Sequence, residues 1–307
     1  MKKIFIINSI DDKDLRFDKW LKLKFSSLNQ SFIEKNIRKE NIKINNKKTI
    51  SKHKLKLKDE IIIFNYNSQI YSHQPTALSK KIIPSKYKEI FNSSIIFENK
   101  DFLIIDKWSG IATQGGSKIN ISIDHLIKSI SESYNLVHRL DRETSGLLII
   151  AKNLQSTKLF GKIFRDHLIT KVYIAICQGI PKNIESEVNI TIDDKKKSNK
   201  KIETITRYKV FQTKNKLSNI VFIPLTGKTH QLRIVSKHLG CPIIGDSKYN
   251  KQDSYNSEKL KLNAHILKFT INNKDYEFVS ELPLHFKEFM AKNKLQKITI
   301  NQIDNFL

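Results

Sequence analysis

An apolar run at residues 147–151 directly follows a loop, residues 138–146, that is crowded with charged and hydroxyl side chains. The run is short and wholly apolar, which predicts a strand buried inside a sheet. Charged groups beside a buried strand need partners or a task, because burying a bare charge is costly. Two interpretations stay open: a reactive loop around Asp141 held by the strand, or a turn at Asp141 and Arg142 stabilised by the neighbouring hydroxyl groups.

The residues before position 91 predict a small unit and a linker. Its apolar side chains recur first at helical and then at strand spacing. The expected elements are helices around 17–21 and 32–37, a strand at 42–44, and a further strand at 54–64 that is interrupted at Asp59 and Glu60. Lysines and arginines can occupy the outer helix faces, where a solvated face is the simpler interpretation of each helix taken alone. Residues 67–90 contain Pro75 and Pro84 and show little periodicity, so we expect a compact unit at 1–66 and a linker at 67–90.

The remainder, residues 91–307, predicts a second domain with many strands and few helices. The expected strands lie at 95–97, 103–105, 147–152, 171–177, 202–211, 219–225 and 263–270, and the expected helices at 154–166 and 229–239. This succession is typical of an α+β domain with a mainly antiparallel sheet. The lysine-rich residues 195–201 are interpreted as an insertion between strands, with RNA contact as the less favoured alternative.

The charge balance favours a polyanionic partner. The chain has 55 Lys and Arg against 30 Asp and Glu, a formal net charge of +25. Such an excess suits binding to phosphates through counterion release, although a general bias towards Lys, Ile and Asn would also raise the charge. We expect a nucleic acid as partner, ahead of bias alone.

Several other classes of protein are disfavoured. No apolar run approaches the ~18 residues that a membrane-spanning helix needs, and acidic residues follow the short apolar start of the chain where a signal peptide would continue. Cys177 and Cys241 are far apart and lack metal-ligand spacing, so neither disulfides nor a zinc site is indicated. We therefore expect a globular cytoplasmic protein without a metal, and no coiled-coil heptad suggests more than a monomer.

A second polar feature lies on the strand predicted at 171–177. Its alternation places Lys171 and Tyr173 together on the face opposite Val172 and Ile174. A tyrosine beside a lysine could stack on a base or pass a proton. The residues alone favour a half-buried tyrosine with a lysine that extends to solvent.

A third feature is the helix predicted at 229–239. Thr229 is expected to cap it and Gly240 to close it. Three cationic side chains recur at spacings of three and four residues, which puts them on one face near the helix start. These are His230, Arg233 and Lys237. Such a row suits a phosphate or a carboxylate, and without a carboxylate to face it would be an exposed basic surface.

Together these segments resemble the RluA-type pseudouridine synthase family. The resemblance rests on His138-Arg139-Leu140-Asp141 with the polar residues after it, Lys171-x-Tyr173, residues 226–233 and residues 240–246, in this order. The first 66 residues resemble an S4-type RNA-binding domain through residues 16–21, 42–45 and 57–61. The resemblance implies an α+β architecture in which this small domain precedes a pseudouridine synthase domain.

The resemblance also implies roles for named residues. Asp141 would be the nucleophile that attacks the ribose of a flipped uridine, paired with Arg233, while Tyr173 packs on the base. Arg139 would fill the gap that the base leaves in the RNA. No cofactor is implied. Further RNA contacts are expected from Lys171, Lys228 and His230 in the catalytic domain and from Arg16, Lys19 and Arg38 in the S4-like domain.

The expected substrate is RNA, and the details of the motifs look closest to bacterial enzymes that modify 23S ribosomal RNA of the large subunit. The family often has arginine at Lys228 and histidine at Val235 and Asn263, so these departures bear on how RNA is gripped. Two alternatives remain. One is a non-catalytic ribosome-associated protein, and the other is a hydrolase or metal-dependent nuclease using His138, Asp141 and His230, which would lack the second clustered carboxylate that such metal sites usually need.

Overall fold

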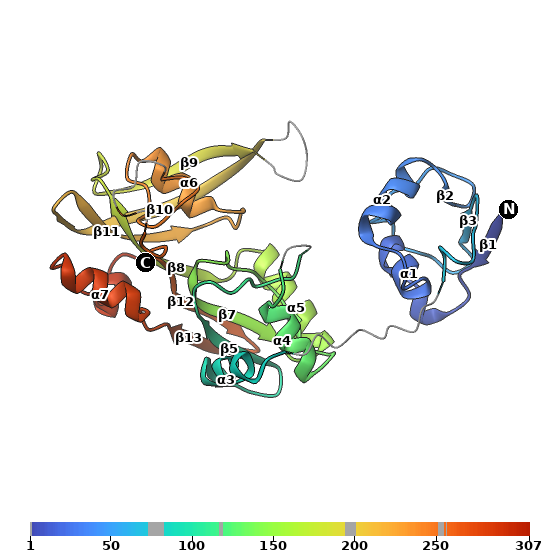
Figure 1. Ribbon diagram of the computed structural model, residues 1–307, viewed down its shortest axis with the longest axis horizontal. Helices are drawn as coiled ribbons and strands as arrows, with labels where there is room; N and C mark the ends of the chain where they lie inside the picture. The colour runs from blue at the N-terminus through green and yellow to red at the C-terminus, as the bar shows by residue number, and fades with distance from the viewer. Residues whose placement is uncertain (1, 73–82, 117–118, 194–200, 251–254, 256) are drawn as a thin grey trace. The chain divides into compact units, whose positions relative to one another are not determined.

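A computed structural model describes residues 2–72, 83–116, 119–193, 201–250, 255 and 257–307 of the chain. The chain forms two compact units, Met1–Ile82 and Ile83–Leu307, and each is described by itself. Figure 1 shows both units with their helices and strands labelled.

The N-terminal unit packs two helices on a small antiparallel sheet of order β1-β3-β2. Its main elements are β1 (Lys3–Ile6), α1 (Phe17–Lys24), α2 (Gln30–Arg38), β2 (Ile42–Ile44) and β3 (Glu60–Ile63), with a 3-10 turn at Ile10–Asp12. Phe17, Leu21 and Ile33 on the inner helix faces are fully buried against Ile61 and its neighbours. Both predicted helices are therefore confirmed, whereas the strand β1 was not predicted.

Two expectations for this part of the chain need correction. The predicted strand at 54–64 begins only at Glu60, because Lys58 has a φ of 69° and the Asp59 carboxylate accepts a hydrogen bond from the backbone N–H of Lys56, which closes a turn. Residues 73–82 of the predicted linker lie outside the described residues. Its last part is not linker, since helix α3 (Ser85–Ser93) starts directly after Pro84, a residue suited to a helix start.

The C-terminal unit is built on one large sheet, in which the described residues form ten strands. The order along the main path is β4-β5-β7-β12-β8-β11-β10-β9, with β13 paired to β12 and β6 to β7. The strands are β4 (Ile95–Glu98), β5 (Phe102–Lys107), β6 (Asn135–Leu136), β7 (Ser145–Ala151), β8 (Thr170–Gln178), β9 (Glu185–Asp193), β10 (Lys201–Lys214), β11 (Leu217–Pro224), β12 (Leu262–Ile271) and β13 (Lys274–Val279). Among the described strands, only the pair β7 and β12 is parallel, so the sheet is mainly antiparallel as predicted.

Helices cover this sheet and close its core. They are α3, α4 (Ile123–Ile130), α5 (Leu154–Arg165), α6 (Gln231–His238), α7 (Leu284–Lys292) and α8 (Ile300–Asp304). Figure 1 shows α3, α4 and α5 beside the part of the sheet that contains β5 and β7, while α6 packs against β10 and β11. The predicted helices at 154–166 and 229–239 are confirmed as α5 and α6. The lysine-rich insertion predicted at 195–201 lies outside the described residues except for Lys201, which begins β10.

Strand β7 is buried along its whole length, as its composition predicted. Leu148 and Ile150 join the apolar cluster on one face of the sheet, and Leu147 and Ile149 join the cluster on the other. The polar loop before β7 therefore emerges at the edge of two hydrophobic layers. This places Asp141 beside the neighbouring strands β12 and β8.

Candidate active site

The loop that carries Asp141 is fastened to the chain segment after β5. The Thr113 hydroxyl donates to the Leu140 carbonyl oxygen at 2.7 Å and accepts from the Leu140 N–H at 3.1 Å. On the other side of Asp141, the Gly110 N–H donates to the Arg142 carbonyl oxygen at 2.9 Å, and the Arg142 Nε donates back to the Gly110 carbonyl oxygen at 2.9 Å. Both backbone neighbours of Asp141 are thus fixed by direct hydrogen bonds.

Lys107, the last residue of β5, also holds the loop that carries Asp141. Its side chain is fully buried, and its Nζ donates to three backbone carbonyl oxygens. These belong to Trp108, Ile111 and Arg142. Burial lowers the pKa of Lys107 to about 7, against the raising effect of the Glu143 and Asp141 carboxylates. Sequence reasoning missed this residue, whose available signal was a lysine at the end of the strand that begins with the apolar residues 102–105.

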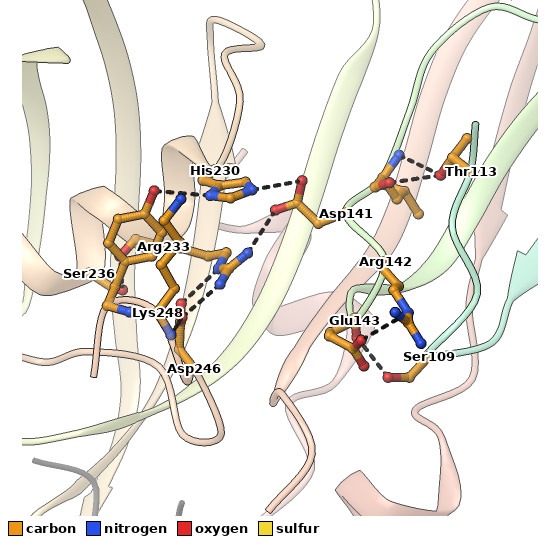
Figure 2. Close-up of polar contacts among 12 residues, drawn as sticks. Ser109, Thr113, Asp141, Arg142, Glu143, His230, Arg233, Ser236, Asp246 and Lys248 are labelled. Atoms are coloured by element: carbon orange, nitrogen blue, oxygen red, sulfur yellow. Dashed lines mark hydrogen bonds and ion pairs between the residues drawn. The ribbon is translucent and has the colours of Figure 1, made fainter. Parts of the chain in front are cut away.

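The Asp141 carboxylate faces Arg233 from α6 and His230, the residue before that helix. Its Oδ2 accepts from Arg233 Nη1 at 3.3 Å, and its Oδ1 lies 3.7 Å from His230 Nε2. The Asp141 side chain keeps 20% of its surface exposed. Figure 2 shows His230 and Arg233 converging on Asp141 from one side, with Thr113 on the other side of the loop. The structure therefore brings together three of the residues that the sequence singled out.

Asp246 anchors Arg233 from behind. Arg233 Nε and Nη2 each donate to a different Asp246 oxygen at 2.7 Å, a bidentate pair whose acid is fully buried. The same carboxylate accepts from the backbone N–H groups of Lys248 and Tyr249. Burial alone would lower the pKa of Arg233, but the hydrogen bonds to Asp246 and the charges of Asp246 and Asp141 raise it, so the guanidinium stays charged. Sequence reasoning gave Asp246 no role, although it ended the fourth motif.

Tyr249 supports the histidine in the same way. Its hydroxyl lies 2.9 Å from His230 Nδ1, and its ring stands edge-on to the imidazole at 5.6 Å. The Arg233 guanidinium lies over the Tyr249 ring at 5.2 Å. Tyr249 was also missed, because nothing in its sequence spacing connects it to position 230.

The start of α6 differs from the prediction. Thr229 is not the N-cap; His230 occupies that position with a φ of 57°, in the left-handed region, and makes no capping hydrogen bond. The Gln231 side chain organises this turn instead, since its Oε1 accepts from the Thr226 hydroxyl and from the Lys228 N–H. The predicted end is confirmed, because Gly240 follows the helix with a φ of 72°. Lys237, the third member of the predicted cationic row, is exposed and does not line the cavity around Asp141.

A cavity of about 530 Å³ opens in front of the Asp141 carboxylate. Tyr173 and Lys171 line it from β8, on the shared face that the alternation predicted. Burial and the nearby Asp141 charge raise the pKa of Tyr173, and burial lowers the pKa of Lys171. Arg139 and Lys228 also line the cavity and are exposed. The predicted catalytic and RNA-contacting residues of this unit therefore share one cavity.

The three basic residues predicted to contact RNA in the N-terminal unit lie at the start of α1 and the end of α2. Lys19 and Arg38 are exposed. Arg16 is half exposed and forms a two-point contact with the buried Asp18 carboxylate.

His138 has a structural role in this arrangement. Its Nε2 accepts from the Ile149 N–H at 2.8 Å, and its ring stacks on Phe164 at 4.8 Å. Burial and the nearby Lys171 charge lower its pKa to about 3, so the ring is neutral. A hydrolase or nuclease that employs His138 with Asp141 and His230 is therefore not supported by the geometry.

The described residues contain no group of three or more His, Cys, Asp and Glu side chains placed to hold a metal ion. Within the same residues, no helix is both long and apolar enough to span a membrane.

The sequence and fold of this chain are similar to those of known proteins. A family model described as RNA pseudouridylate synthase matches residues 101–238. The ribosomal large subunit pseudouridine synthase C of Rickettsia felis is 38% identical over 290 residues, which cover 89% of this chain and 95% of the relative. The corresponding protein of Buchnera aphidicola subsp. Baizongia pistaciae is 35% identical over 82% of this chain and 83% of the relative. Among solved structures, human RNA pseudouridylate synthase domain containing 4 aligns with a TM-score of 0.61 and 22% identity over 72% of this chain and 99% of that one, which shows a shared fold.

Proposed function

The chain belongs to the RNA pseudouridylate synthase family and isomerises uridine to pseudouridine in RNA, and from this premise we propose that Asp141 is its nucleophile and large-subunit ribosomal RNA its substrate. The single observation that carries the assignment of Asp141 is its place in the cavity. Its carboxylate is partly exposed there and is flanked by Arg233 and His230.

The geometry suits attack on an anomeric carbon. In the proposed reaction an Asp141 oxygen attacks C1′ of a flipped uridine, and the bond from C1′ to N1 breaks with its electron pair leaving on the base. The base turns, its C5 forms the new bond to C1′, and the Asp141 carboxylate is released. The C5 proton is then lost and a proton is taken up at N1. Positive charge grows on the sugar during each displacement, so an ionised carboxylate helps both as attacker and as counter-charge.

Tyr173 has the position to hold the flipped base. Its side chain lines the cavity and packs between the apolar clusters on β8. Burial raises the pKa of its hydroxyl, so the phenol stays protonated near neutral pH and would donate a proton before it accepted one. We assign to Tyr173 the packing surface for the base and a part in proton transfer.

The RNA strand would be held by cations around the cavity and by the N-terminal unit. We assign Arg139 to the gap left by the flipped base, and Lys171, Lys228 and His230 to further RNA contacts at the cavity wall. We also propose that the N-terminal unit is an S4-type RNA-binding domain covering residues 1–66, with Arg16, Lys19 and Arg38 in contact with phosphates, ahead of a catalytic domain within residues 91–307. We propose this substrate because relatives are named ribosomal large subunit pseudouridine synthase C, and with it we propose that the enzyme acts in the cytoplasm.

Tritium release tests the role of Asp141. Large-subunit ribosomal RNA transcribed in vitro carries tritium at uridine C5, and formation of the new carbon bond frees it as water. We expect release by the wild type and a loss on the order of 10⁴-fold or more in Asp141→Ala, because among the described residues that line the cavity Asp141 is the only acid.

The control replaces an exposed acid of α7 that is remote from the cavity lining, Glu288→Gln, and should release tritium at the wild-type rate. Equal release by wild type and Asp141→Ala would contradict the role of Asp141. A wild-type protein that releases no tritium from ribosomal RNA but does so from transfer RNA would contradict the proposed substrate alone.

A further inference from the structure

The two oxygens of Asp141 are served by two different side chains, and both of these depend on one short segment, residues 246–249. Arg233 donates to Oδ2 and is gripped by Asp246. His230 faces Oδ1 and contacts the hydroxyl of Tyr249. The orientation of the Asp141 carboxylate is thus coupled to a segment that does not itself touch it.

Asp246 builds this segment. It is fully buried and binds Arg233 through both oxygens, so the guanidinium cannot rotate without breaking two charge-assisted hydrogen bonds. Asp246 Oδ1 also accepts a hydrogen bond from the Tyr249 backbone N–H at 3.0 Å, so the same carboxylate positions the backbone from which the Tyr249 ring extends. Arg233 then lies over the face of that ring.

The Tyr249 hydroxyl determines how His230 presents its ring. With Nδ1 engaged by the hydroxyl, Nε2 is the nitrogen that faces the Asp141 carboxylate. A bare lone pair on Nε2 would repel Oδ1, whereas a hydrogen on Nε2 attracts it. The favoured state therefore has Tyr249 donating to Nδ1 and a hydrogen on Nε2 that points at Asp141. His230 has a φ of 57°, a conformation that histidine tolerates better than most residues, so its backbone also aims the ring.

We propose that Tyr249 is a positioning residue of the isomerisation: its hydroxyl holds His230 with the Nε2 hydrogen towards Asp141 Oδ1, while Asp246 holds Arg233 against Oδ2. This inference rests on the proposed function of Asp141 as nucleophile. At 3.7 Å the His230 contact exceeds hydrogen-bond length, whereas Arg233 bonds Oδ2, so Oδ1 is the less constrained oxygen and the one assigned to attack C1′.

A packing role for Tyr249 makes a different prediction from a positioning role. The Tyr249 ring contacts both His230 and Arg233. Tyr249→Phe keeps the ring and removes only the hydroxyl. If the ring alone mattered, this variant would behave like the wild type.

The experiment compares kcat and KM for tritium release from large-subunit ribosomal RNA. We expect Tyr249→Phe to lower kcat about tenfold with KM unchanged, since one oriented hydrogen bond behind the nucleophile is lost and RNA contacts are kept. In a His230→Ala background the same substitution should change kcat less than twofold, because no imidazole remains for the hydroxyl to hold.

Tyr276→Phe is the matched control. Tyr276 lies on β13, where its ring stacks on Phe269 and Phe278 in a hydrophobic cluster, and it does not line the cavity. This variant should retain the wild-type kcat and KM. Thermal unfolding of each variant, compared with the wild type, separates a loss of turnover from a loss of folded protein.

Two results would overturn the inference. One is an unchanged kcat in Tyr249→Phe. The other is an equal loss from Tyr249→Phe in the wild-type and His230→Ala backgrounds, which would mean that the hydroxyl acts without the imidazole. Both comparisons use the active wild type as reference, so a failure of the proposed function appears separately, as absence of release by the wild type itself.

Discussion

At the scale of single residues, the site depends on which charges are partnered before RNA arrives. The Asp246 carboxylate is buried, and its oxygens accept hydrogen bonds from Arg233 and two backbone N–H groups. The Asp141 carboxylate contacts the same arginine but remains partly exposed in the cavity. The difference explains why Asp141 is available for chemistry and Asp246 for support, although both carboxylates lie within reach of the same guanidinium.

The half-buried His138 makes the free energy of unfolding depend on pH within a definable window. Burial, with the Lys171 charge adding to it, lowers its folded-state pKa to about 3, while the unfolded value is near 6.5. Between these values the unfolded chain binds the extra proton, so the free energy of unfolding falls as pH falls. The slope approaches ~1.4 kcal/mol per pH unit. From pH 6.5 to 5, urea unfolding should show the wild type losing about 1.5 kcal/mol more than His138→Gln.

Glutamine is chosen because its side-chain oxygen can still accept from the Ile149 N–H that His138 now binds. His238→Gln serves as the control, since His238 is exposed on α6 and should leave the pH slope as it is in the wild type. Parallel slopes in the wild type and His138→Gln would mean that His138 takes up its proton in the folded state as well.

At the scale of elements, the junction of β7 with β12 fixes the distance between the Asp141 loop and the rest of the cavity. Gly146 has a φ of 107°, and a Cβ there would lie 2.3 Å from the Ala264 carbonyl oxygen and 2.6 Å from its nitrogen. Both are backbone atoms in a buried parallel pairing, so they cannot yield as a flexible side chain would. We expect Gly146→Ala to cost more than ~3 kcal/mol of stability, measured by urea unfolding.

Gly161→Ala provides a matched substitution of opposite sign. Gly161 lies inside α5, where the nearest atom to an added Cβ is the end of the Arg165 side chain at 3.5 Å. Alanine there should stabilise the protein by about 0.5–1 kcal/mol through helix propensity. A Gly146→Ala protein as stable as the wild type would show that the two strands can separate locally without cost.

Local sequence patterns predicted some elements of the fold and not others. The strands β7, β8 and β11 and the helix α5 follow from local patterns, because their apolar residues face cores that the spacing itself defines. Helix α4 and strand β9 were not predicted, although the first has a Ser122 cap and the second alternates. Strand β9 is half exposed, so its signal is weak beside those of the buried strands, whereas α4 was missed despite an amphipathic pattern that buries Ile123, Leu126 and Ile127.

For the site, the sequence provided the residues but not their supports. Asp141 and Arg233 stand in conspicuous motifs, and the structure places them 3.3 Å apart. Lys107, Asp246 and Tyr249 act through contacts between segments far apart in the chain or through a turn that only the fold creates. No local period connects Tyr249 with His230. Thr229 was assigned as a cap from its residue type, whereas the Gln231 side chain determined the turn.

At the scale of the whole molecule, the two units bury separate cores. The cluster around Phe17 and Trp20 contains only residues of the N-terminal unit, and the clusters around the large sheet contain only residues after position 82. Contacts with RNA can therefore be altered in one unit while the cavity of the other is left intact. The net charge of +25 makes such contacts strongly dependent on salt.

The N-terminal unit should contribute to affinity and not to turnover. In Lys19→Gln with Arg38→Gln, two exposed cations on α1 and α2 are removed without loss of a buried contact. If each neutralises one phosphate, the slope of log affinity against log salt should become shallower by about 1.5–2, while kcat for tritium release at saturating RNA stays at the wild-type value. Filter binding at several salt concentrations measures the slope. Lys292→Gln with Lys274→Gln removes two exposed cations from α7 and β13 of the C-terminal unit, outside the cavity lining. This control should keep the wild-type slope; an equal change in both pairs would mean that charge acts through the molecule's overall field and not through a binding face on the small unit.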